Sequence, residues 1–192
     1  MSFIPVVMQW PLVLLPVHIV FLELIIDPAC SVVFEAEAEE AGIMRRPPRN
    51  PEEPLFGKRI VLISLLQGLS VLAIVLGVFL TARALGQGED GARALAVVTL
   101  ILSNLALILT NRSWTRTIWG MFRSPNAALV WVLGGTVIFI SLILYVPFLR
   151  NMFRFSFLHP VDLLLCIAAA GVSVLWFEGL KILRRRSGRN IA

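Results

Sequence analysis

Five long apolar runs, separated by short polar segments, dominate the chain. They cover approximately residues 17–34, 60–82, 92–110, 127–149 and 161–183. Each run is close to the ~20 residues that a helix needs to cross the hydrocarbon core of a bilayer. The pattern therefore predicts an all-α protein, a multi-pass membrane bundle of about five transmembrane helices that we treat as one membrane domain over residues 1–192.

The segment before the first run has a different pattern. Residues 1–16 are apolar but include Pro5, Pro11 and Pro16. Three prolines so close together argue against one straight helix and favour the end of a preceding helix followed by a short turn. We expect this start to be cut from something longer.

Composition and charge narrow the class of protein. Of the 192 residues, 58% are hydrophobic, and the mean hydropathy is +0.85, which excludes an ordinary soluble domain. The formal net charge is +5, but the basic residues cluster between apolar runs and no basic helix with interleaved aromatic residues is present. We therefore expect the basic residues to reflect how the chain is oriented in the membrane. The expected partner is the lipid bilayer and not a nucleic acid.

The positions of the lysines and arginines predict the orientation. Most of the 17 basic residues follow the first, third and fifth runs, and the opposite side keeps Arg83, Arg93, Arg150 and Arg154. The positive-inside rule then places the C-terminal tail in the cytoplasm. We expect an integral protein of the plasma membrane.

Two carboxylates lie inside the first apolar run. Glu23 and Asp27 are the only charged residues between Phe3 and Phe34, and an ionised carboxylate near the bilayer centre costs on the order of 2.5–3.5 kcal/mol. Residues four apart share a helix face, so both can reach one ligand. Pro28 lacks an N–H and leaves the carbonyl oxygen of Leu24 without its helical donor, which loosens the helix at that level.

This combination predicts a cation or proton site. Glu23 and Asp27 would be the metal ligands, together with the backbone carbonyl of Leu24, because carboxylate and carbonyl oxygens suit a hard cation. The alternative is structural: a proline kink whose protonated or hydrogen-bonded carboxyl groups only hold helices together. We expect no cofactor in this chain. The ion bound at the site would be the transported cation, which is either a divalent metal ion or a proton.

The segment 36–59 is the only connection with distinctive content. Its core, residues 43–56, is rich in proline, which keeps it extended and reduces the entropy lost on ordering. A stiff, charged and extended segment is suited to docking on another protein domain. The predicted contact residues are Arg45, Arg46, Pro47, Pro48 and Arg49. The alternative is a solvated linker whose basic patch touches anionic lipid.

Several single polar residues within the runs have simpler interpretations. His18 near the outer end of the first span is interpreted as an interfacial histidine, with a proton relay as the alternative. Cys30 is interpreted as a small apolar filler rather than a soft-metal ligand. For Gln67, Thr99 and Ser103 we expect hydrogen bonds between helices, whereas Asn104 is kept as a weak cation ligand.

The last span contains two acidic residues with local explanations. Glu178 lies three residues before Lys181, which predicts an i,i+3 ion pair. Asp162 follows Pro160 at the start of the span, where an acidic residue complements the helix N-terminus.

Two stretches together resemble a known family. They are Leu15-Pro16-Val17 leading into Phe21–Pro28, and Met44–Arg49 followed by Pro51–Leu55. They resemble the C-terminal transmembrane region of P-type cation-transporting ATPases, the calcium-pump-like group. Asn111-Arg112-Ser113 is similar to the family's loop after the same span, and the resemblance covers essentially the whole chain.

The resemblance implies roles for individual residues. The five spans look like helices six to ten of a ten-helix pump, and residues 1–10 look like the end of helix five. Asp27 matches the family's cation-coordinating aspartate. Calcium pumps have an asparagine at the position of Glu23, a threonine at that of Ile26 and a glutamate near that of Asn104, so this chain departs from the calcium-pump pattern at all three.

The resemblance also implies partners. These would be the cytoplasmic phosphorylation and nucleotide domains and the N-terminal membrane helices of a P-type ATPase. The family's Asp-Lys-Thr-Gly-Thr phosphorylation motif is absent from this sequence, so we expect no ATPase activity from the chain alone. The competing interpretation is a non-enzymatic, free-standing membrane bundle, either a regulatory subunit or a truncated remnant.

Overall fold

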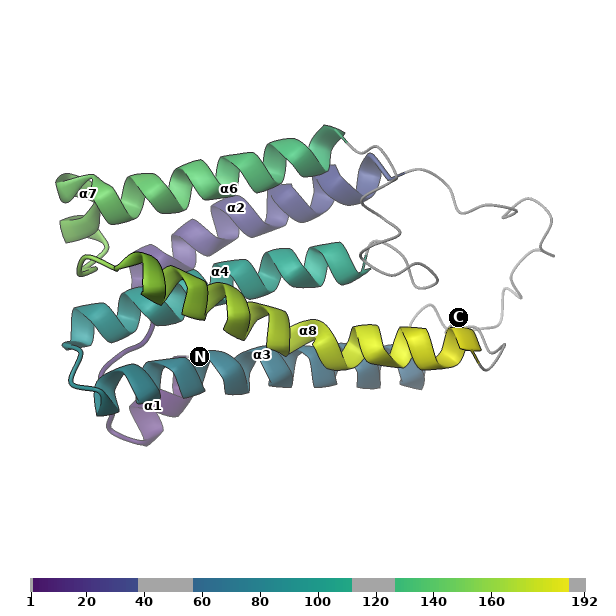
Figure 1. Ribbon diagram of the computed structural model, residues 1–192, viewed down its shortest axis with the longest axis horizontal. Coiled ribbons are helices and arrows are strands. Elements are labelled where there is room, and N and C mark those ends of the chain that lie inside the picture. The colour runs from purple at the N-terminus through teal and green to yellow at the C-terminus, as the bar shows by residue number, and fades with distance from the viewer. Residues whose placement is uncertain (1, 38–56, 112–126, 187–192) are drawn as a thin grey trace.

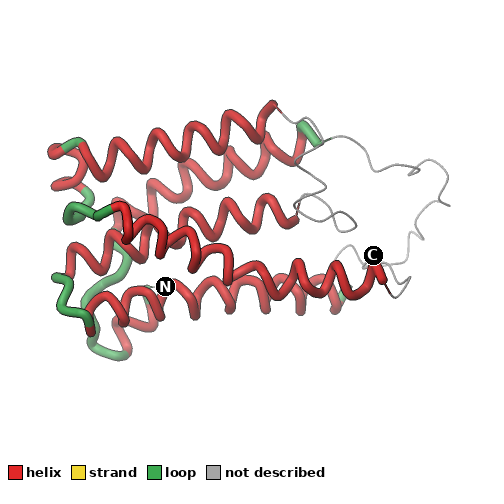
Figure 2. The backbone as a smooth tube through the Cα atoms, viewed as in Figure 1, coloured by secondary structure: helices red, strands yellow, loops and turns green. Residues whose placement is uncertain are grey.

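A computed structural model describes residues 2–37, 57–111 and 127–186, and every regular element in this part of the chain is a helix (Figures 1 and 2). The elements are α1 (Phe3–Val7), α2 (Pro16–Glu35), α3 (Lys58–Ala84), α4 (Glu89–Asn111), α6 (Ala127–Tyr145), α7 (Pro147–Met152) and α8 (Pro160–Arg186).

Five of these helices are long and apolar enough to cross a membrane. The qualifying segments are Pro16–Glu35, Ile60–Ala84, Glu89–Asn111, Ala127–Tyr145 and Pro160–Ile182. The prediction of an all-α membrane bundle with about five spans is therefore confirmed. In Figure 1 the five long helices run side by side, and the short helix α7 lies at one end of them.

Helix α4 lies at the centre of the bundle. Every residue from Gly91 to Ile101 is buried, and α4 packs most extensively against α8 and α3. Its first half contains Gly91 and three alanines, and such small side chains let neighbouring helices approach closely. The largest apolar cluster fills this region, with Val75 and Phe79 of α3 and Cys166 of α8 fully enclosed.

Helices α2 and α6 form a second, smaller contact region beside α4. Ala29 and Val33 of α2 pack with Leu105 and Ile108 of α4 and with Leu129 of α6. Nearer the other end, the rings of Phe21 and Phe139 stack with their centroids 3.9 Å apart. Helix α2 is thus held between α4 and α6 along one of its faces.

The fourth span ends earlier than predicted. Helix α6 stops at Tyr145, and Val146 adopts an extended conformation with φ −83° and ψ 115° before α7 begins at Pro147. The cause is Pro147, because the proline ring disfavours the helical conformation of the residue that precedes it. The predicted span 127–149 therefore comprises a long helix and the first turn of a short one.

The N-terminal segment follows the predicted pattern. Helix α1 ends at Val7, and residues 8–15 form a loop in which Gln9 has a positive φ of 54°. Arg93 of α4 secures this loop: its Nε donates to the carbonyl oxygen of Leu12 at 3.2 Å, and its Nη1 contacts Asp90 at 2.6 Å. Nη1 also donates to the carbonyl oxygen of Arg154 at 3.3 Å.

Candidate cation site

Helix α2 carries the predicted carboxylates and is continuous through Pro28. It extends from Pro16 to Glu35 without interruption, so the expected loosening at the proline does not break the helix. Pro28 has no N–H group to donate to the carbonyl oxygen of Leu24, the acceptor four residues earlier. The backbone thus provides one carbonyl oxygen without its usual helical donor.

Glu23 projects from the exposed face of α2. Its side chain is exposed, and that of the adjacent Leu24 is 69% exposed. Within the described part of the chain, Glu23 forms neither a hydrogen bond nor an ion pair. Position 27 lies one turn further along the helix, and the side chain of Asp27 is outside the described set.

The opposite face of α2 accounts for this exposure. His18, Ala29 and Val33 are buried on it and contact the rest of the bundle through α4, α6 and the segment that precedes α8. Since a helix presents one face to its neighbours at a 3.6-residue period, Glu23 is turned away from α4 and α6. The arrangement orients the carboxylate away from the helices of this chain.

Asn104 lies on α4, in the part of that helix that packs against Ala29 and Val33 of α2. It is half-buried and shares a helix stripe with Leu105 and Ile108, which pack against Ala29 and Val33 of α2. It has no hydrogen bond to any other described residue. The fold therefore brings Asn104 to the α2 side of α4, whereas Glu23 faces away from it.

His18 has a different environment from the one predicted. The interpretation as an interfacial histidine is wrong, because the side chain is 0% exposed. Its Nδ1 accepts the backbone N–H of Leu15 at 3.0 Å, and its Nε2 donates to the carbonyl oxygen of Phe153 at 2.8 Å. The ring also stacks on Phe155, with the centroids 5.0 Å apart. His18 thus fixes the first turn of α2 to the segment before α8.

No preformed metal cage is visible among the described side chains. They contain no group of three or more His, Cys, Asp or Glu residues placed to hold a metal ion. Cys30, the weak candidate for a soft-metal ligand, is half-buried in the apolar cluster between α2, α4 and α6, which fits the interpretation as an apolar filler.

The opposite end of the bundle contains a buried polar network. The side-chain amides of Gln67 on α3 and Asn111 on α4 exchange two hydrogen bonds, of 3.1 and 3.3 Å. The predicted hydrogen bond between helices is therefore confirmed for Gln67. The hydroxyl groups of Thr99 and Ser103 are buried and have no hydrogen-bond partner among the described residues.

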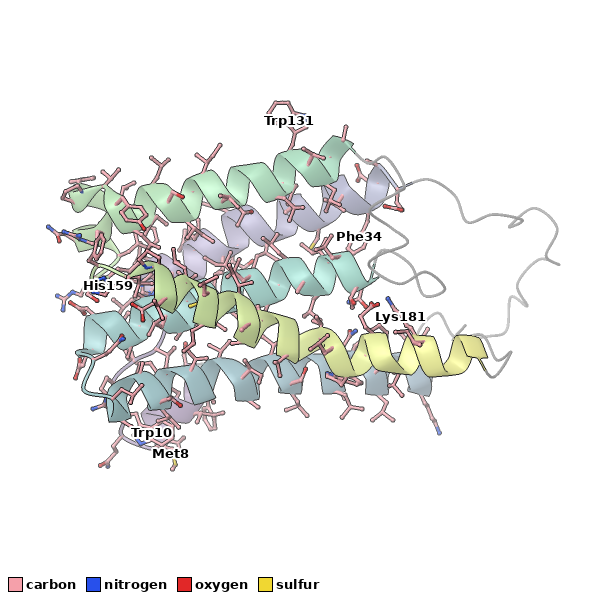
Figure 3. The ribbon with its side chains drawn as sticks, viewed as in Figure 1. Met8, Trp10, Phe34, Trp131, His159 and Lys181 are labelled. Carbon is pink, nitrogen blue, oxygen red and sulfur yellow. The ribbon has the colours of Figure 1, made fainter. Side chains whose placement is uncertain are left out.

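The predicted ion pair of α8 belongs to the same region. Lys181 Nζ lies 3.0 Å from Glu178 Oε1, and Lys181 also donates to the carbonyl oxygen of Thr110 on α4, whose hydroxyl group donates to Glu178. The pair is confirmed, but it is not a surface pair, because Lys181 is 3% exposed. Figure 3 shows Lys181 at the end of α8 that lies near the end of α4.

The predicted docking residues lie outside the described part of the chain. This applies to Arg45, Arg46, Pro47, Pro48 and Arg49, and to the rest of the proline-rich core.

Comparison with known families gives a match over most of the chain. The family described as "Cation transporting ATPase, C-terminus" matches residues 11–183. This range includes all five segments that are long and apolar enough to cross a membrane, and both carboxylates of α2.

Individual relatives agree with the family match. The chain is 23% identical over 179 residues to "Calcium-transporting ATPase" of Bacillus subtilis, which covers 92% of this chain and 20% of the relative. It is 27% identical over 150 residues to "Probable cation-transporting ATPase F" of Mycobacterium tuberculosis, covering 78% of this chain and 16% of the relative. It is 26% identical over 165 residues to "Cation-transporting ATPase pma1" of Synechocystis, covering 83% of this chain and 18% of the relative. The chain thus spans at most about a fifth of the length of these relatives.

Proposed function

The chain belongs to the family of cation-transporting ATPase C-termini, and from this premise we propose that it forms part of the cation or proton translocation site of an ATP-driven pump. Glu23 and Asp27 of α2 are the proposed ligands, together with the carbonyl oxygen of Leu24. Asn104 of α4 is a weaker candidate. The remaining ligands, the other membrane helices and the phosphorylation and nucleotide domains are contributed by other parts of the pump.

The exposure of Glu23 is the observation that carries this proposal. Glu23 is the eighth residue of a 20-residue span, about 10 Å along the helix from its first residue. A carboxylate facing lipid at that depth would cost on the order of 2.5–3.5 kcal/mol, whereas one facing other helices and a cation would be stabilised. The outward face of α2 is therefore the proposed surface at which the rest of the pump completes the site.

Occupancy of this site is proposed to reach the phosphorylation domain through segment 36–59. This segment directly follows α2 in the sequence, so a shift of α2 on binding a cation would move its first residues. Its basic and proline-rich core, Arg45–Pro54, would then dock on the phosphorylation domain and report the shift. The proposal depends on the sequence of this segment and on its attachment to α2.

Ion-dependent phosphorylation tests the ligand assignment. In the reconstituted complete pump, we expect Asp27→Asn to abolish the cation-dependent formation of phosphoenzyme from labelled ATP. Glu23→Gln should raise the half-saturating cation concentration about tenfold or more, which corresponds to ~1.4 kcal/mol of lost binding. Glu35→Gln is the matched control, because Glu35 lies on the same helix at its end, and it should leave the response unchanged. Unchanged ion dependence in Asp27→Asn would remove Asp27 from the site.

The size of the native polypeptide separates the pump from the free-standing bundle. An antibody against residues Lys181–Ala192 should detect a band several times larger than 21.3 kDa, or a smaller chain that co-purifies with a second chain carrying the phosphorylation domain. A band at 21.3 kDa without such a partner would support a non-enzymatic bundle instead.

A further inference from the structure

A groove on the side of the bundle, distinct from the candidate cation site, lies between α3 and α8. It has a volume of about 350 Å³ and opens on the outside of the described helices, with Leu95 of α4 in its floor. Helices α3 and α8 contact each other and separate towards the end at which α3 finishes and α8 begins (Figure 1). Small residues make it possible, since Ala73 and Gly77 face Ala169 across it.

The groove is apolar along most of its length and polar at one end. Ile74, Val78 and Val172 line its apolar part, whereas Thr81, Gln87 and Asp162 are its polar lining residues. Thr81 is in the last turn of α3, Gln87 is in the turn between α3 and α4, and Asp162 is in the first turn of α8. The polar groups therefore gather at the end of the spans, at the depth where a lipid headgroup meets the acyl region.

Asp162 gives this end a negative charge. One of its carboxylate oxygens, Oδ2, accepts the backbone N–H of His159 at 2.9 Å, which is the back-bond that an acidic residue at the third helical position makes to the N-cap. Within the described part of the chain, no lysine, arginine or histidine side chain pairs with Asp162. A half-buried carboxylate at a membrane surface is stabilised by a cationic partner.

We propose that this groove binds a phospholipid with a primary ammonium headgroup, of the phosphatidylethanolamine class. One acyl chain lies between α3 and α8, the ammonium donates hydrogen bonds to Asp162, and the side-chain amide of Gln87 donates to the lipid phosphate. A quaternary ammonium has no N–H to donate, and a headgroup with only negative charge is repelled by Asp162.

The dimensions of the groove favour an acyl chain over a protein helix. The groove closes where the Ser70 hydroxyl group of α3 donates to the carbonyl oxygen of Ser173 on α8 at 3.0 Å, which leaves less room there than the ~10–12 Å that an α-helix with its side chains needs. A single acyl chain is narrow enough to enter between α3 and α8. The site is thus complementary to a lipid both in its shape and in its charge.

Native mass spectrometry of the purified full chain in detergent tests the proposal, with phosphatidylethanolamine, phosphatidylcholine and phosphatidylglycerol of identical acyl chains as probes. We expect about fivefold more retention of phosphatidylethanolamine than of the other two, because only its headgroup forms charge-assisted hydrogen bonds with Asp162. Asp162→Asn should reduce this preference to near unity. The substitution preserves an oxygen that can accept the His159 N–H, so the helix start is kept.

A second pair of variants tests the groove itself. Gly77→Leu places a large side chain in the groove, where a Cβ atom meets nothing within 4 Å, and Gly68→Leu makes the same change at an equally open site on α3 that does not line the groove. Gly77→Leu should reduce the retention of phosphatidylethanolamine, and Gly68→Leu should not. Equal retention of the three lipids by the unsubstituted chain would overturn the proposal, as would equal effects of the two leucine variants. A dimer that Gly77→Leu disrupts would assign the groove to a second copy of the chain.

Discussion

At the scale of single residues, His18 determines how the carboxylate helix begins. Its imidazole ring accepts one hydrogen bond from Leu15 and donates one to Phe153, 135 positions further along the chain. One ring nitrogen is an acceptor and the other a donor, which defines a neutral tautomer. Arg93 secures the same end of the bundle through the carbonyl oxygens of Leu12 and Arg154.

Replacing His18 should loosen this end of α2. We expect His18→Ala to destabilise the chain by about 2–4 kcal/mol, because it removes both hydrogen bonds and leaves the buried carbonyl oxygen of Phe153 and the half-buried N–H of Leu15 without partners. The free energy of unfolding, measured by circular dichroism in mixed detergent micelles, provides the test. His159→Ala is the matched control, because the His159 ring is exposed (Figure 3), and it should change stability by less than about 0.5 kcal/mol. Equal losses in the two variants would exclude a special role for His18.

The buried pair on α8 provides a second prediction at this scale. Removing one partner of a buried ion pair typically costs about 3–5 kcal/mol, because the other charge stays buried. Lys181→Met should therefore be strongly destabilising, whereas the double variant Lys181→Met with Glu178→Gln should recover a large part of the loss. A double-mutant cycle of unfolding free energies measures the coupling. Additive losses would show that the two side chains act independently.

Interactions between residues close together in the sequence were predictable, whereas interactions between distant residues were not. The role of Asp162 at the start of α8 and the pair of Glu178 with Lys181 were predictable, because both depend only on residues close together in the sequence. The burial of His18 was not predictable, because its partner in the chain is Phe153. The same is true of Lys181, whose burial depends on Thr110 of α4.

At the scale of elements, α2 combines fixed and exposed features. Its first turn is held by the hydrogen bonds of His18, and its second half packs through Ala29 and Val33 on α4 and α6. Between these attachments lie Glu23 and the carbonyl oxygen of Leu24, on a stretch of helix with one hydrogen bond fewer than usual because of Pro28. This stretch is where a helix can adjust most easily when a ligand binds.

We therefore expect Pro28 to lower the stability of α2 and to be needed for the response of the pump to the cation. Pro28→Ala should stabilise the isolated chain by about 1–3 kcal/mol, because it restores a donor for the Leu24 carbonyl oxygen. In the complete pump the same variant should weaken the response to the cation. Pro16→Ala is the control, since proline at the first helical position costs little. Thermal unfolding in micelles measures the stability of both variants, and a destabilised Pro28→Ala protein would contradict this account.

The boundaries of the elements were less predictable than their number. The five apolar runs follow directly from hydropathy, because each must cover the bilayer. The end of α6 at Tyr145 depends on one proline inside an apolar stretch. Hydropathy does not register that break, whereas the steric effect of Pro147 on Val146 explains it.

At the scale of the whole molecule, the bundle has a compact part and an attached part. Helices α3, α4 and α8 share the most extensive contacts and hold the polar network of Gln67, Asn111 and Lys181. Helices α2 and α6 add Phe21, Ile143 and Leu144 to the largest core and form the smaller cluster with the second half of α4. Trp131 of α6 points away from the bundle (Figure 3) and is 81% exposed. The carboxylate helix therefore lies on the less enclosed side.

The candidate site could be predicted only in part from the sequence. Two carboxylates in an apolar run predict a polar site within the membrane, and their spacing places both on one face of α2. The direction of that face could not be predicted, because it depends on which other helices cover α2. Asn104 shows the same limit, since the helix that covers its neighbours Leu105 and Ile108 depends on how α2 packs on α4.

The central claim is that a cation binds at Glu23 and Asp27, and its most direct test is site-specific protection from a carboxyl-reactive carbodiimide in the complete pump. The reaction would be followed by peptide mass spectrometry across a panel of cations and pH values, with the exposed Glu35 as the internal reference. Our account predicts that one cation, or deprotonation alone if a proton is transported, slows the labelling of Glu23 and Asp27 together relative to that of Glu35. Labelling of Glu23 and Asp27 that no cation changes, and that follows pH as the labelling of Glu35 does, would contradict it.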